Sequence, residues 1–232
     1  MRNYLVSFVM AAFLGTGAWA QENKAKMSIN VCPQWHADLG VKAGADVFIP
    51  FGQSRWGFEP GLYWSFRNAT SEHTANKNQE NYNDEVHYLD VPLRLSVRLA
   101  GREESPFNMS FLFGPYLAYG LSGTSHYTIT KDGNVTQGES DAFSSEGRLE
   151  SRFDYGLNLG LSAVIQQHLK VGLFTEIGLK GIYRQNSIAE VIIGDLFGVT
   201  KINLGAGISV GYQFYYSKTL IMNVINRWFL SR

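Results

Sequence analysis

Apolar and polar residues alternate along most of the chain after residue 20. The clearest case is HYLDVPLRLSVRL, residues 87–99, where six aliphatic side chains share one parity and three charged ones, Asp90, Arg94 and Arg98, share the other. Because successive side chains of a β-strand point to opposite faces, this stretch predicts a strand with one apolar and one charged face. The apolar face belongs against a protein core or against lipid.

The same alternation predicts eight strands. They cover residues 27–35, 41–49, 56–66, 89–99, 109–121, 153–161, 169–179 and 202–214. Most span nine residues or more. Strands of soluble proteins average about five or six residues, whereas a tilted transmembrane strand needs about 9 to 11.

Glycine and charge fill the opposite faces of these strands, and the chain holds 24 glycines. The solvent face of a soluble barrel would instead carry Lys, Glu and Thr, and a soluble barrel with an apolar ligand inside would turn its apolar faces inward. An eight-stranded membrane barrel has a lumen just wide enough for side chains to fill it, which favours small residues there. We therefore expect an all-β fold, an eight-stranded antiparallel up-and-down transmembrane β-barrel.

The connections between the predicted strands alternate in length. Short or modest ones cover 51–54, 100–107 and 166–168, and long polar ones cover 68–86, 123–150 and 184–200. Transmembrane barrels have short periplasmic turns and longer extracellular loops. The pattern predicts a bacterial outer-membrane protein with periplasmic N- and C-termini and exposed, mobile loops, and the lipid bilayer as its surroundings.

Aromatic residues fall near both ends of the predicted strands, as expected for the aromatic girdles of a membrane barrel. The alternative is the aromatic core of a β-sandwich. The predicted girdle residues are Trp56, Phe58, Phe107, Tyr212 and Phe214 at the periplasmic end, and Trp64, Phe66, Tyr119, Phe153 and Tyr155 at the extracellular end.

The two ends of the chain differ from the barrel region 21–214. Residues 1–20 have Arg2, an apolar run and the small-residue motif Ala18-Trp19-Ala20, which predicts a signal peptide cleaved before Gln21. Residues 215–232 form a tail with apolar residues at helical spacing, consistent with an amphipathic helix or with a frayed end. We expect the apolar segment 188–199 to cap the barrel mouth, to dock a partner, or to fold back as a continuation of the neighbouring strands.

Composition excludes several classes of site. Lys plus Arg equals Asp plus Glu at 20 each, which gives no indication of nucleic acid as a partner. Cys32 is the single cysteine, and the five histidines lack the spacing of metal ligands. We expect neither a metal nor a cofactor.

Charged residues on the inward parity balance in sign, and we expect them to form an ion-pair network inside the barrel rather than an ion path. Its predicted members are Lys42, Asp46, Glu59, Asp90, Arg94, Arg98, Asp154, Lys170, Glu176 and Lys180.

One pair of residues suggests a different function. Ser125 and His126 lie where the fifth predicted strand leaves the membrane, as a small outer-membrane hydrolase of lipid or peptide would require. A His beside a Ser is common, however, and no acidic residue that would orient the His is identifiable. No catalytic residue is therefore predicted, and the hydrolase remains the alternative function.

Four stretches carry a resemblance to a known family. They are YLDVPLRLSVRL at 88–99, FGPYLAYGLSG at 113–123, FDYGLNLGLS at 153–162 and GISVGYQF at 207–214. The chain resembles, over residues 40–214, the PorT-type outer-membrane β-barrel family of Bacteroidetes. The resemblance implies an eight-stranded outer-membrane barrel, and the namesake of the family takes part in protein export across the outer membrane.

The function that we expect is non-enzymatic. The barrel would anchor exposed loops that bind a partner or support protein export, with envelope or secretion-machinery proteins as the partners. Members of the family usually end at the aromatic residue that corresponds to Phe214, so the tail after it departs from the family pattern.

Overall fold

The computed structural model describes residues 25–36, 38–75, 78–102, 105–131, 133–144, 149, 151–179 and 203–215. The predicted signal peptide, Lys180, the apolar segment 188–199 and the tail after Tyr215 lie outside these residues. No helix long and apolar enough to cross a membrane occurs in the described part of the chain. Nine β-strands are described: β1 (Lys26–Trp35), β2 (Leu39–Pro50), β3 (Trp56–Ala75), β4 (Asn78–Ala100), β5 (Phe107–Lys131), β6 (Asn134–Asp141), β7 (Phe153–Ile165), β8 (Leu169–Gly178) and β9 (Asn203–Tyr215).

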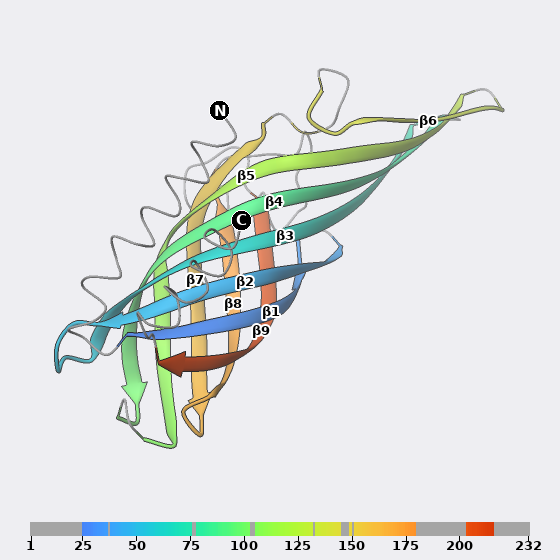
Figure 1. Ribbon diagram of the computed structural model, residues 1–232. Helices are drawn as coiled ribbons and strands as arrows, with labels where there is room; N and C mark the ends of the chain where they lie inside the picture. Colours follow the sequence, from blue (N-terminus) through green and yellow to red (C-terminus); the bar gives the residue numbers. More distant parts are fainter. Residues whose placement is uncertain are drawn as a thin grey trace, which may run out of the picture.

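Eight of these strands form a closed antiparallel ring (Figure 1). Each strand pairs with its neighbours in the order β4, β3, β2, β1, β9, β8, β7, β5, and β5 returns to pair with β4. Closure leaves no open sheet edge in the ring, as a bilayer requires of any spanning β-structure. The predicted eight-stranded barrel is confirmed, including the first strand, predicted at 27–35 and found at Lys26–Trp35.

Two of the predicted long loops are in fact β-structure. β3 and β4 stay paired as far as Ala75 and Asn78, and β5 continues to Lys131, where β6 folds back onto it. The loop predictions for 68–86 and 123–150 were therefore largely wrong, and β6 was missed. The reason is physical: both faces of this region are polar, so the alternation that marks a half-buried strand is absent.

The part of the sheet beyond the ring is called here the protruding sheet. It consists of residues 68–75 of β3, 78–85 of β4, 124–131 of β5, and β6. Figure 1 shows these strands leaving one end of the barrel together as a curved extension. We call that end of the barrel the hairpin end, and the opposite end, with the short connections after β2, β4 and β7, the turn end.

The ring is apolar outside and polar inside. Large apolar side chains are exposed on the outer surface of every strand of the ring, such as Ile29 on β1, Leu95 on β4 and Leu173 on β8. On β3, ten residue steps separate Trp56 from Phe66, which at about 3.3 Å per residue and a tilt near 45° gives a height of about 23 Å. This height matches the apolar band of about 25 Å that transmembrane barrels present to lipid.

Leu173→Arg tests whether the outer surface faces lipid. Leu173 lies mid-strand on β8 with 59% of its surface exposed, and an Arg near the bilayer midplane is expected to lower the free energy of unfolding by about 2 to 4 kcal/mol. Val135→Arg is the matched control, because Val135 is 62% exposed but lies on the protruding sheet. Denaturant unfolding in lipid vesicles measures both, and equal effects of the two substitutions would contradict the assignment.

Candidate functional site

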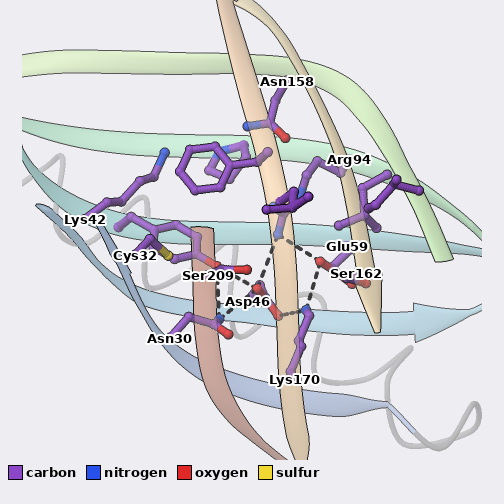
Figure 2. Close-up of a pocket in the computed structure, with 16 residues that line it drawn as sticks. Asn30, Cys32, Lys42, Asp46, Glu59, Arg94, Asn158, Ser162, Lys170 and Ser209 are labelled. Atoms are coloured by element: carbon purple, nitrogen blue, oxygen red, sulfur yellow. Dashed lines mark hydrogen bonds and ion pairs between the residues drawn. The ribbon is translucent and has the colours of Figure 1, made fainter. Parts of the chain in front are cut away.

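Two groups of ion pairs fill the barrel interior. The first, the turn-side cluster, consists of Asp46, Glu59, Arg94 and Lys170, from β2, β3, β4 and β8. Lys170 Nζ lies 2.8 Å from Asp46 Oδ1 and 3.0 Å from Glu59 Oε1. Arg94 Nη2 contacts the same two carboxylates, at 3.2 Å and 2.8 Å. Figure 2 shows Asp46 and Glu59 bridged by these two cations across the lumen.

Neutral donors complete the coordination of Asp46. The Tyr63 hydroxyl donates a hydrogen bond to Asp46 Oδ2 at 2.6 Å, and Asn30 Nδ2 donates to the same oxygen at 2.9 Å. All of these residues are buried. A buried carboxylate is stable only when charges and hydrogen bonds replace its hydration, and here both do.

The second group, the hairpin-side cluster, consists of Lys42, Arg67, Asp90, Asp154 and Glu176. Lys42 Nζ lies 3.0 Å from Asp90 Oδ2 and 2.6 Å from Glu176 Oε1. Arg67 reaches Asp90 at 3.1 Å and Asp154 at 3.0 Å through separate nitrogens. Because Asp90 is shared by both cations, these contacts link β2, β3, β4, β7 and β8 across the ring.

Hydrogen bonds and a ring contact surround the hairpin-side cluster. Tyr116 and Asn203 both donate to Asp154 Oδ2, at 3.0 Å and 3.2 Å, and Asn158 donates to Glu176. The Arg67 guanidinium lies 4.4 Å from the centre of the Tyr88 ring. Such a cation–π contact gains strength when both groups are removed from water.

The space that remains in the interior is small. A cavity of about 20 Å³ lies beside the turn-side cluster, next to Asn30 and Cys32. A second, of about 30 Å³, is lined by Lys26, Arg98 and Gln213 nearer the turn end. Each has room for about one water molecule. Neither of these two cavities can hold a solute larger than water.

Eight of the ten predicted network residues lie in the two clusters. Arg98 instead borders the second cavity together with Glu59 and Lys170, and Lys180 is outside the described residues. Arg67 was missed, although it is fully buried and contacts three carboxylates. It follows Glu59 and Tyr63 at even spacing, so extending the alternation one step past Phe66 would have found it.

The predicted girdle residues lie on the outer surface in two groups. Trp56, Phe107 and Tyr212 are exposed near the turn end, and Trp64, Tyr119, Phe153 and Tyr155 are exposed on the side of the hairpin end, whereas Phe58, Phe66 and Phe214 are half-buried. A histidine stacks on each group. His87 lies against Trp64 with ring centres 5.5 Å apart, and His168 lies against Tyr212 at 5.2 Å.

The structure does not bring Ser125 and His126 together as a catalytic pair. They are consecutive residues of β5, so their side chains point to opposite faces of the protruding sheet. Ser125 is buried and donates to Asp84 Oδ1 at 2.5 Å, while His126 is 48% exposed with its Nδ1 3.7 Å from Glu139. The parity of the two positions was itself evidence in the sequence against the pair. No group of three or more potential metal ligands occurs among the described residues.

Residues 7–184, more than half of the chain, match the family described as "Outer membrane protein beta-barrel domain". The chain belongs to this family. It is an outer-membrane barrel embedded in the lipid bilayer of a bacterial outer membrane. No curated protein matches it.

Solved structures similar to this outer-membrane barrel include three from different bacteria. Ail, the attachment invasion locus protein of Yersinia pestis, is 11% identical, with 83% of this chain and 99% of that one covered and a TM-score of 0.36. The N-terminal β-barrel domain of Pseudomonas aeruginosa OprF is 14% identical, with 83% and 99% covered and a TM-score of 0.34. A major outer membrane protein from Thermus thermophilus is 14% identical, with 82% and 99% covered and a TM-score of 0.40.

Arg94→Leu tests the contribution of the turn-side cluster. Removing the cation leaves Asp46 and Glu59 with Lys170 alone, and breaking a buried ion pair in this way costs about 3 to 5 kcal/mol of unfolding free energy. Arg55→Leu, in the exposed connection after β2, is the control and is expected to change it by less than about 0.5 kcal/mol. Denaturant unfolding in lipid vesicles gives both values, and equal values would refute a stabilising role for the cluster.

Ser125→Ala and His126→Ala are expected to differ in their effect on the protruding sheet. The first leaves the buried Asp84 carboxylate without one donor, which costs about 1 to 3 kcal/mol. The second truncates an exposed side chain and is expected to cost less than about 0.5 kcal/mol. Hydrogen exchange of the β5 and β6 amides reports the local opening free energy, and a larger effect of His126→Ala would be the contrary result.

Proposed function

We propose that this outer-membrane barrel is a non-enzymatic, PorT-type protein of Bacteroidetes that displays the protruding sheet for binding and thereby supports protein export across the outer membrane. The filled lumen supports the proposal, because a barrel closed by its own ion pairs is unsuited to diffusion. Binding would then take place on the surfaces at the ends of the barrel. Envelope or secretion-machinery proteins are the proposed partners.

The protruding sheet is the observation that carries this proposal. Nine residue steps of β3 lie beyond Phe66, which at about 3.3 Å per residue gives an extension of about 30 Å. The strands are continuous with those of the ring, so the sheet inherits its orientation from the barrel. A surface held in this way binds a partner without the entropic cost of ordering a loop.

The proposed orientation places the protruding sheet outside the cell. Residues 1–20 act in this proposal as the signal peptide that directs export, and residues 21–214 form the barrel domain. Lys26 and Tyr215, which are paired at the turn end, then lie on the periplasmic side together with the tail. Transmembrane barrels consistently carry their short turns on the periplasmic side.

A deletion strain tests the role in export. We expect selective loss of exported proteins from the medium, measured by quantitative proteomics of medium and outer membrane, and full recovery with the intact chain. A variant in which residues 70–83 and 126–139 are each replaced by an Asn-Gly turn keeps the ring and is expected not to restore export.

Two results would contradict the proposal. An unchanged medium in the deletion strain would exclude the export role. Full recovery with the shortened variant, present in the outer membrane at the level of the intact chain, would exclude the protruding sheet as the surface that acts.

A further inference from the structure

We propose that the outer edge of β6 is a docking site for an extended, basic polypeptide segment, which adds to the protruding sheet as a further strand. The inference rests on the proposed function, because it names the class of partner that the protruding sheet binds. The recognition is mainly through the backbone, as in other cases where a peptide completes a sheet edge.

Among the described strands, β6 has a neighbour on one side only. It pairs with β5 along its whole length, from Asn134 opposite Lys131 to Asp141 opposite Thr124. β5 is in turn paired with β4, so the opposite side of β6 is an edge of the sheet. Eight residues of strand are thus presented along one line.

The alternating direction of the backbone hydrogen bonds shows which amides and carbonyls of β6 point away from β5. Ala142, next in register after β6, donates its amide to Gly123 of β5 at 3.1 Å. In an antiparallel ladder alternate residues bond to the same neighbour, so even-numbered residues of β6 face β5. Val135, Gln137 and Glu139 therefore turn their amides and carbonyls to the open side.

The other edge of the protruding sheet is closed where it leaves the barrel. Asp38, in the connection between β1 and β2, accepts the amide of Thr70 through Oδ2 at 2.5 Å and donates its own amide to the carbonyl of Asn68 at 3.1 Å. No comparable cap contacts the outer side of residues 134–140 in the part of the chain that the structure describes. The β3 edge is thus covered at residues 68–70, whereas the described residues show no such contact along residues 134–140 of β6.

β6 lacks three of the devices that protect edge strands, namely proline, lysine and a β-bulge, although it carries Glu139 and Asp141. The sequence NVTQGESD contains no Pro and no Lys, and the pairing of β6 with β5 runs without a register shift. Val135 is 62% exposed on this strand. An edge without these three devices can pair with another chain.

The carboxylates beside the β6 edge indicate the charge of the segment that would bind there. Glu85 and Glu139 lie on the same face of the protruding sheet, two residue pairs apart in the register, and Glu139 is 73% exposed. On that face Asp141 is held by Arg152 at 3.3 Å, and Glu139 lies 3.7 Å from His126. A basic side chain on the added strand would pair with Glu139, and an opposite charge directly across a ladder is favourable. The partner is therefore an extended segment with a lysine or arginine opposite Glu139.

The experiment uses the purified full chain in lipid nanodiscs and a fluorescent peptide of about eight residues with alternating lysine and valine. We expect the peptide to bind, measured by fluorescence anisotropy, and to slow hydrogen exchange at Val135, Gln137 and Glu139. The same peptide N-methylated at alternate amides keeps its charge but loses one hydrogen-bonding edge, and is expected to bind at least tenfold more weakly.

Protein variants separate backbone pairing from charge. Gln137→Pro removes an outward amide without touching the bonds to β5, and should weaken binding at least tenfold relative to Gln137→Ala. Glu139→Gln should weaken it severalfold, whereas Glu80→Gln, which removes a carboxylate from the opposite face of the protruding sheet, should not. Hydrogen exchange of the even-numbered β6 amides verifies that each variant keeps its pairing with β5.

Three outcomes would overturn the inference: no binding of the peptide, equal binding of the N-methylated peptide, or protection that appears on β3 instead of β6. The proposed function fails separately, in the deletion strain. A Gln137→Pro protein that binds no peptide but restores export would overturn the docking site at β6 and leave the export role intact.

Discussion

The width of an eight-stranded ring is the constraint on which the rest of the structure depends. Strands from opposite sides of so narrow a barrel must share its interior, and charged side chains placed there have no water to hydrate them. Each therefore meets an opposite charge from another strand, as Lys42 on β2 meets Glu176 on β8. The glycines between them follow from the same shortage of space.

The narrow interior also gives the barrel and the protruding sheet different roles. The two charge clusters link strands that are distant in sequence, as Lys170 on β8 and Glu59 on β3 are, and so hold separate parts of the ring together. The ion pairs occupy the lumen of the described barrel, whereas the protruding sheet lies outside it. The protruding sheet extends well beyond the ring at the hairpin end (Figure 1).

The sequence predicted the ring well and the protruding sheet poorly, and lipid explains the difference. A strand such as residues 89–99 must be apolar on its lipid face, so its alternation is nearly perfect. Both faces of β6 are exposed to solvent, and the strand is held by backbone hydrogen bonds to β5. Its sequence therefore shows no alternation of apolar and polar residues. Arg67 was missed for a related reason, because the predicted strand stopped one residue before it. The cross-lumen partner of any charge, such as Asp154 for Arg67, depends on ring closure and could not be predicted from spacing.

The continuity of β3, β4 and β5 has a mechanical consequence. Each of these strands runs unbroken from the turn end of the barrel to the far part of the protruding sheet. A pull on that far part acts along the strands and loads their ladder hydrogen bonds in shear, all at once, rather than peeling them apart one at a time. Resistance to shear grows with the number of bonds that share the load, and the ring, which lipid prevents from opening, takes up the remainder. The protruding sheet is thus joined to the barrel in a geometry that spreads an axial load over the whole ladder.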